Sequence, residues 1–156
     1  MKKAVLAVLV AGVAAASAGC GASGSSGRCD GRIGSTSLSG PINANTARWH
    51  WLAAKTRVAL VFRYSNDQLR IEGEFRPTSS TDGLGTFPLP TSSGSSGRVA
   101  SWEIMSPTQR PNLASGHLTF DGWGEELSGS FQMVHQEGSE LNCTFKLLHD
   151  AEADAL

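Results

Sequence analysis

The chain has 156 residues, with 13 lysines and arginines against 14 aspartates and glutamates, so its formal net charge at pH 7 is −1. A length of this order fits one domain with one hydrophobic core. Because the charge is nearly balanced and no basic stripe is present, the sequence gives no electrostatic case for nucleic-acid binding, and no nucleic-acid partner is predicted.

The first twenty residues contain the three regions of a secretory signal. Met1-Lys2-Lys3 supply positive charge, an apolar run extends from Ala4 to Ala18, and small residues follow up to Cys20. A membrane-spanning helix needs roughly 20 apolar residues, and this run is shorter and leads into a Gly/Ser stretch. The sequence therefore predicts a cleaved export signal at residues 1–19.

The end of this signal is similar to a known processing motif. Ser17-Ala18-Gly19-Cys20 resembles the lipobox of bacterial lipoproteins, with Ser17 where leucine is usual. The resemblance implies a diacylglyceryl group on the Cys20 thiol and cleavage just before it. Cys20 would then anchor the chain on the non-cytoplasmic side of a membrane of the bacterial cell envelope. Ala16-Ser17-Ala18 also fits ordinary signal peptidase, which would release a secreted or periplasmic soluble protein starting at Gly19.

Composition and cysteine count predict how the chain continues. Residues 20–28 are rich in glycine and serine and are expected to form a flexible tether. With Cys20 assigned to the lipid, Cys29 and Cys143 remain as a pair outside the cytosol, where disulfides persist. We expect these two cysteines to bond to each other; two free thiols are the alternative.

Alternation of apolar and polar residues predicts an antiparallel hairpin between residues 57–64 and 68–75, with Asn66-Asp67 as a two-residue turn. This turn brings the apolar faces of both strands to the same side, so the register is self-consistent. The predicted register pairs Val58 with Phe75, Phe62 with Ile71 and Tyr64 with Leu69.

A second hairpin is predicted between residues 127–136 and 140–149. A three-residue loop, Glu137-Gly138-Ser139, brings their apolar faces together, and its glycine suits the left-handed position of such loops. The predicted register pairs Met133 with Cys143 and Phe131 with Phe145.

Weaker alternation predicts further strands at residues 31–39, 46–52, 84–89, 98–105 and 115–121. A short helix at residues 46–55 is the alternative, because Asn45 and Thr46 are plausible N-caps. We therefore predict an all-β domain over residues 29–149, built as a single antiparallel β-barrel or closed β-sandwich of about 8–9 strands. The disulfide would join its first strand to its last. Residues 150–156 are expected to form a disordered tail.

The sequence contains no recognisable catalytic or cofactor motif. The four histidines are not spaced with Cys, Asp or Glu as metal ligands are, and each is interpreted as a surface or packing residue. No catalytic residue, cofactor or metal site is predicted. Asp121, Glu125 and Glu126 surround one turn; they suit a carboxylate pair or a calcium site, but a solvated acidic turn is the simpler interpretation.

Trp123 is the one residue that the sequence nominates for contact with a partner or ligand. It stands between Gly122 and Gly124, beside acidic residues, in a loop whose composition favours exposure. An exposed indole suits stacking on a sugar ring or anchoring a protein partner. The alternative is a ring that folds back over the edge of the sheet.

These observations lead to three hypotheses for function. The first is a non-enzymatic envelope lipoprotein, held to the membrane by lipid on Cys20, whose β domain serves protein interaction or a structural role, with another envelope protein as the candidate partner. The second is a barrel that carries a small apolar ligand. The third is a hydrolase of envelope polymer.

Overall fold

The computed structural model describes residues 24–64, 70–79, 81–90, 98–105 and 112–155. In this part of the chain none of the helices has the length and apolar character to span a membrane. The described elements are β1 (Ser26–Ile33), β2 (Thr36–Pro41), β3 (Arg48–Leu52), β4 (Arg57–Arg63), β5 (Arg70–Phe75), β6 (Gly85–Pro88), β7 (Val99–Met105), β8 (Leu113–Gly122), β9 (Glu126–His135), β10 (Glu140–His149) and the 3-10 helix η1 (Ala153–Ala155).

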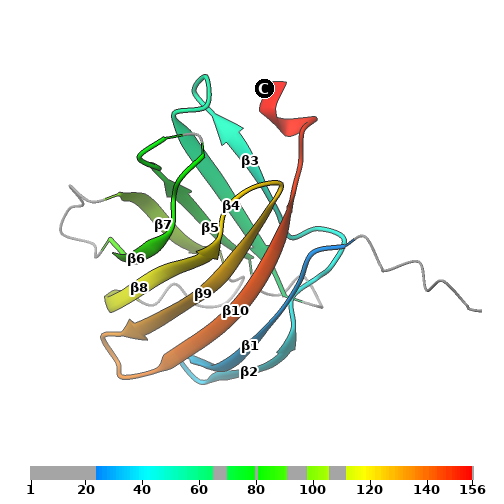
Figure 1. The fold of residues 1–156 in the computed structure, drawn as a ribbon. Helices are drawn as coiled ribbons and strands as arrows, with labels where there is room; N and C mark the ends of the chain where they lie inside the picture. Colours follow the sequence, from blue (N-terminus) through cyan, green and yellow to red (C-terminus); the bar gives the residue numbers. More distant parts are fainter. Residues whose placement is uncertain (1–23, 65–69, 80, 91–97, 106–111, 156) are drawn as a thin grey trace, which may run out of the picture.

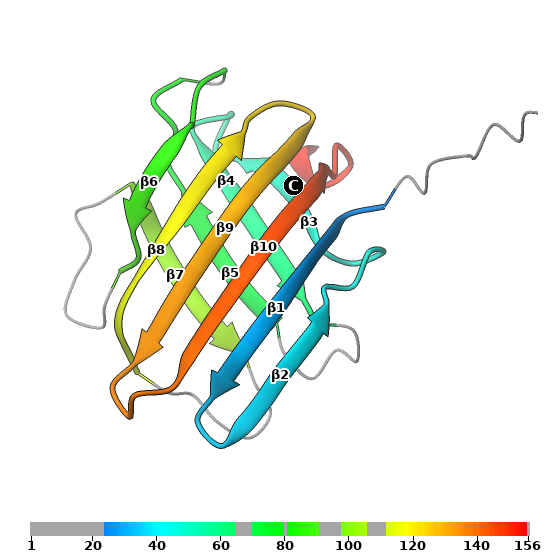
Figure 2. The ribbon, with the colours of Figure 1, turned by 60° about the horizontal axis from the view of Figure 1, so that its bottom comes forward.

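The strands form one sheet that bends into a nearly closed barrel (Figure 1). Its two layers face each other in Figure 2: a front layer of β6, β8, β9, β10, β1 and β2, and a rear layer of β3, β4, β5 and β7. β10 joins the layers, because it pairs with β1 and β9 along most of its length and with β3 at its end. The predicted all-β, barrel-like class is confirmed, with ten strands in the described residues instead of eight or nine.

The first two strands form a hairpin where a single strand was predicted over residues 31–39. Ile33 and Leu38 are both buried, yet an odd separation in one straight strand would place them on opposite faces. A turn at Gly34, whose φ of 57° is left-handed, resolves this conflict. It places Leu38 opposite Gly31, so that both apolar side chains face the core.

The hairpin of β4 and β5 has the predicted register. Val58 pairs with Phe75 and Phe62 pairs with Ile71. The predicted turn and the pairing of Tyr64 with Leu69 involve residues outside the described ones.

β3 is a strand, so the helical alternative for residues 46–55 is wrong. Trp49 and Trp51 are buried while their neighbours are half-buried, as expected for alternation along a strand rather than a helical stripe. β3 pairs with β4 over its whole length. The loop that follows places residues 53–55 in the left-handed region, which ends any helical path.

The hairpin of β9 and β10 forms, but its predicted register is wrong. Phe131 pairs with Cys143, and Met133 pairs with Leu141 rather than with Cys143. The loop consists of residues 136–138, because the His135 N–H donates to the Ser139 carbonyl at 2.9 Å, and Gly138 takes the left-handed position at its end with φ 82°. The true register differs from the predicted one by two residues, so the same side chains face the core.

The chain enters the domain through a buried serine. Ser25, which is 1% exposed, lies where β10 exchanges its partner β1 for β3. Its hydroxyl donates to the Ala47 carbonyl at 2.6 Å, and accepts from the Leu148 N–H at 2.9 Å and from the Arg48 guanidinium at 3.1 Å. The ordered domain therefore begins ahead of Cys29, and residues 24–28 do not belong to a tether as predicted.

The C-terminal residues fold back onto the barrel instead of forming the predicted disordered tail. The Asp154 carboxylate accepts a hydrogen bond from the backbone N–H of Trp51 at 2.6 Å, and the Asp150 N–H donates to the Trp49 carbonyl at 2.8 Å. Two strand-to-tail hydrogen bonds thus hold η1 against β3.

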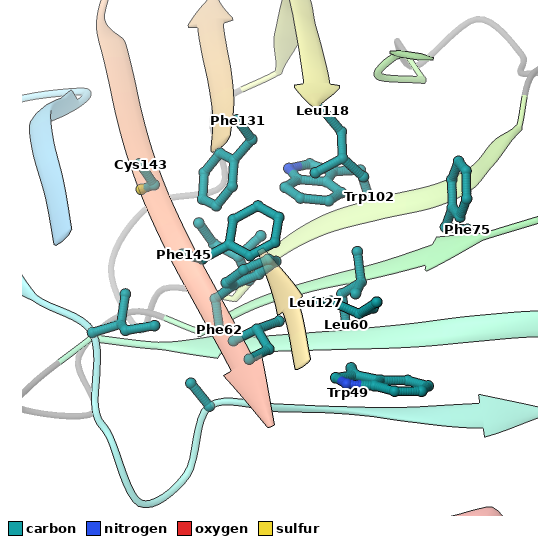
Figure 3. Close-up of a cluster of buried hydrophobic side chains, with 14 of the residues drawn as sticks. Trp49, Leu60, Phe62, Phe75, Trp102, Leu118, Leu127, Phe131, Cys143 and Phe145 are labelled. Atoms are coloured by element: carbon teal, nitrogen blue, oxygen red, sulfur yellow. The ribbon is translucent and has the colours of Figure 1, made fainter. Parts of the chain in front are cut away.

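The interior between the layers is filled by aromatic and aliphatic side chains (Figure 3). Phe62 lies at its centre, with ring centroids 5.0 Å from Phe131, 5.1 Å from Phe145 and 5.8 Å from Trp102. These separations are those of aromatic rings in direct contact. The two layers therefore share one packed core at this level.

Candidate functional site

The predicted disulfide is present. Cys29 of β1 and Cys143 of β10 are direct cross-strand partners, with Cα atoms 4.1 Å apart, and both are buried. The bond joins the first strand to the last, as predicted. Cys20, the predicted site of lipid attachment, lies outside the described residues.

Trp123 packs against the core, in agreement with the interpretation of a ring folded back over the edge of the sheet and not with an indole presented to solvent. The side chain is partly buried at one end of the core, with ring centroids 5.1 Å from Phe120, 5.7 Å from Phe75 and 6.4 Å from Trp51. A Cβ atom added to Gly83 would meet the indole at 2.4 Å. Burial of a large ring stabilises the fold more than the flanking glycines favour exposure.

We predict that Trp123→Ala lowers the unfolding free energy by about 2–3 kcal/mol, because truncation of a partly buried indole removes apolar burial and leaves a cavity. Chemical denaturation monitored by circular dichroism measures the change. Gly124→Ala in the same turn is the matched control, since nothing lies within 4 Å of the added Cβ and no effect is expected there. Equal stability of the two variants would contradict the inward packing.

His135 belongs to a buried cluster that resembles a catalytic set only in composition. Its Nδ1 lies 3.1 Å from the Ser139 hydroxyl, which donates to the Glu137 carboxylate at 2.6 Å. The hydrogen bond from Ser139 lowers the pKa of Glu137. Serine thus stands between the other two groups and is buried, whereas a nucleophilic serine needs histidine as its base and must reach a substrate. The cluster stabilises the β9–β10 loop.

His149 helps to hold the C-terminal residues. Its ring stacks on Trp49 with a centroid separation of 4.2 Å and an interplanar angle of 15°, and its Nε2 lies 2.9 Å from the Asp154 carboxylate. Burial raises the pKa of Asp154, but the hydrogen bonds from Trp51 and His149 outweigh it and leave the pKa below its usual value. The Glu125 carboxylate lies 3.6 Å from the other ring nitrogen of His149, Nδ1.

The carboxylates of the acidic turn, which are those of Asp121, Glu125 and Glu126, do not converge on a common point. Glu126 forms an ion pair with Lys146, while Glu125 faces His149. Within the described residues, no group of three or more His, Cys, Asp or Glu side chains could hold a metal ion.

The outer surface of the front layer carries a polar hollow of about 550 Å³, here called the front hollow. Cross-strand pairing builds it as a grid: Gln132 of β9 stands between His117 of β8 and Asn142 of β10, and Thr144 of β10 stands between Ser130 and Arg28. Its lining residues are Arg28, Asp30, His117, Ser130, Phe131, Gln132, Asn142, Cys143 and Thr144.

Hydrogen bonds fix the polar groups on one side of the front hollow. The amide nitrogens of Gln132 and Asn142 both donate to the same carboxylate oxygen of Glu140, at 2.6 and 2.8 Å. These bonds, from Asn142 first and then from Gln132, lower the pKa of Glu140. Since the carbonyl and NH₂ groups of an amide point in different directions from one carbon, the carbonyl oxygens of Gln132 and Asn142 are not used by Glu140.

A second network fixes the other side of the front hollow. Arg28 donates from Nε and Nη2 to the two carboxylate oxygens of Asp30, at 2.7 and 3.0 Å, and the Ser39 hydroxyl donates to the same carboxylate at 2.7 Å. The hydrogen bond from Arg28, followed by that from Ser39, lowers the pKa of Asp30. The bidentate pair cancels the charges of Arg28 and Asp30 locally.

The outer surface of the rear layer carries a smaller hollow of about 360 Å³, here called the rear hollow, and it is charged. Glu72 is paired across the strands with Glu103, and an ion pair joins it to Arg70. Glu74 forms an ion pair with Arg57 at 2.7 Å. The rear hollow therefore presents ionised groups where the front hollow presents mainly neutral ones.

Sequence reasoning did not identify the front hollow. Its outward residues alternate with core residues along the strands. The signal that could have found it is the exact register, because only the true pairing places Gln132 beside Asn142 and Ser130 beside Thr144.

Comparison of the chain with protein-family models, with curated proteins and with solved structures finds no match. We therefore infer its function from its residues and their geometry.

Proposed function

We propose that this protein is a lipoprotein of the bacterial cell envelope, anchored through lipid on Cys20, whose β domain acts by binding rather than by catalysis. The observation that carries the proposal is that the ordered fold begins a few residues after the lipobox-like segment, at the buried Ser25. Ser25 is buried in a three-way hydrogen-bonded junction, and Cys29 is bonded to β10. In a domain that is anchored through its N-terminus, we expect the start of the first strand to be held firmly, as Ser25 and Cys29 hold β1.

The binding role is supported by where polar groups and aromatic rings lie. The front hollow offers hydrogen-bonding side chains that are already held in place by Glu140 and by Asp30. The rings of Phe62, Phe131 and Phe145 fill the centre of the barrel, where an apolar cargo would have to sit. This arrangement favours recognition on the outer surface over carriage of a ligand inside.

We predict that the mature protein begins with Cys20 carrying a diacylglyceryl group. Mass spectrometry of the N-terminal peptide measures its sequence and added mass, and cell fractionation measures its membrane association. Cys20→Ala is the control, because it removes the thiol that accepts the lipid, so the mature N-terminus with the added mass should disappear. A mature chain that starts at an unmodified Gly19 would instead establish a soluble secreted or periplasmic protein.

A further inference from the structure

We infer that the front hollow is a binding site for an uncharged, hydroxyl-rich glycan. This inference deepens the proposed function: it rests on the β domain having a binding role and assigns the class of ligand. It does not depend on whether Cys20 carries lipid.

The charge of the front hollow favours a neutral ligand. Arg28 and Asp30 neutralise each other through a bidentate contact, and His117 is the remaining ionisable side chain among the described residues that line the hollow. A phosphate or carboxylate ligand needs an unpaired cation, and an ammonium ligand needs an unpaired anion. The front hollow offers neither in its lining, and the Glu140 carboxylate beside it already accepts hydrogen bonds from the Gln132 and Asn142 amides.

The hydrogen-bonding groups of the front hollow suit a ligand that both donates and accepts. In the described part of the chain, the Gln132 and Asn142 carbonyl oxygens accept no hydrogen bond from protein, because their amide nitrogens are the atoms that Glu140 holds. The hydroxyls of Ser130 and Thr144 beside them can donate or accept. Sugar hydroxyls have the same dual capacity, so a polyhydroxylated chain can satisfy acceptors and donors in alternation.

The groups are also organised in advance of binding. Glu140 restrains both amides, and Asp30 restrains the Arg28 side chain, so a ligand has less ordering of these solvent-exposed side chains to do. Side chains that are already restrained lose less entropy on binding. The hollow volume of about 550 Å³ lies within the range of small-molecule sites.

The rear hollow provides an internal comparison. It lies on the same kind of outward strand surface, but Glu72, Glu74 and Glu103 give it an acidic character. Glu72 and Glu74 are paired with Arg70 and Arg57, and removal of hydration from these ion pairs and from the Glu103 carboxylate by a neutral sugar would be unfavourable. Glycan binding is therefore expected at the front hollow alone.

The test is a titration of the full mature protein, in a zwitterionic detergent without a sugar head group, with cellohexaose and with chitohexaose. Hexagalacturonate and anionic phospholipid vesicles serve as charged probes. Nuclear magnetic resonance follows the side-chain amide signals of Gln132 and Asn142. We expect saturable shifts of these signals with at least one neutral oligosaccharide. The double variant Gln132→Ala, Asn142→Ala should weaken binding roughly tenfold or more, because two hydrogen bonds are lost.

Two further variants make the result specific. Glu103→Ala truncates an outward side chain at the rear hollow and should leave glycan affinity unchanged. His117→Ala removes a lining side chain of the front hollow and should weaken binding, and because it leaves the Glu140 network intact it keeps the test valid if the double variant unfolds. No shift with either neutral oligosaccharide up to about 10 mM would overturn the inference. Binding of the charged probes alone would overturn it equally. Glycan binding by a chain that lacks lipid would keep the inference and overturn only the anchoring.

Discussion

Replacement of both Cys29 and Cys143 by alanine is expected to lower the unfolding free energy by about 4–5 kcal/mol. The disulfide spans a sequence separation of 114 residues, and a cross-link over a loop of this length removes that much conformational entropy from the unfolded chain. Alanine avoids placing hydroxyl groups at two positions that are only 3% exposed. Thermal denaturation should show a midpoint lowered by more than about 10 °C.

The cross-strand position of the disulfide provides a control for this prediction. β1 pairs with β10 on both sides of the bond, so the native pairing can persist without it, and the variant should fold at low temperature with an unchanged circular dichroism spectrum. Wild-type protein treated with a reductant should lose the same stability. Identical midpoints with and without reductant would show that the entropic constraint does not determine the stability of this domain.

The alternation of apolar and polar residues was sufficient to predict the strand register where only one register buries the apolar side chains of both strands. The register of the β4–β5 hairpin was predicted correctly, because it brings the apolar sides of both strands together, while a slip by one residue would turn one of them outward. The pairing of Cys29 with Cys143 could be predicted as well. Once Cys20 is assigned to lipid, two cysteines in an oxidising compartment leave one possible bond.

Pattern was insufficient where two arrangements bury the same side chains. In the β9–β10 hairpin, the predicted loop at residues 137–139 and the observed loop at residues 136–138 both leave the apolar residues facing inward, so periodicity could not separate them. The position of Gly138 could have decided the matter, because a left-handed residue belongs at the end of a three-residue loop and not at its middle. The odd sequence separation between Ile33 and Leu38 also pointed to the β1–β2 turn, because both side chains are apolar and one straight strand would place them on opposite faces.

The candidate site could not be predicted, because it depends on which strands are neighbours in the sheet. Local sequence patterns do not determine that strand order. The partner exchange of β10 from β1 to β3 determines which outward surfaces become continuous. The two interpretations of Trp123 could not be separated for a related reason: its local glycines favour exposure, but Phe75 and Phe120 offer an aromatic surface that only the assembled barrel provides.

Phe62→Ala is expected to lower the unfolding free energy by about 3–5 kcal/mol. The Phe62 ring is 2% exposed and contacts Phe131 and Phe145 at centroid separations of 5.0 and 5.1 Å, so its loss leaves a cavity lined by both layers. The layers are joined through β10 and cannot close on the void without moving the sheet. Partial collapse would lower the cost towards the smaller value.

This variant also separates surface recognition from carriage of an apolar ligand. If the barrel enclosed a cargo, Phe62 would line a ligand space and its truncation would cost little and enlarge that space. In a packed core, the purified wild-type protein should retain no small molecule in native mass spectrometry, and the variant should be strongly destabilised. Leu84→Ala, at a side chain that is 54% exposed, is the control and should change stability by less than about 0.5 kcal/mol. A stable Phe62→Ala protein that binds apolar molecules as the wild type does would favour the carrier over a β domain that works through its outer surface.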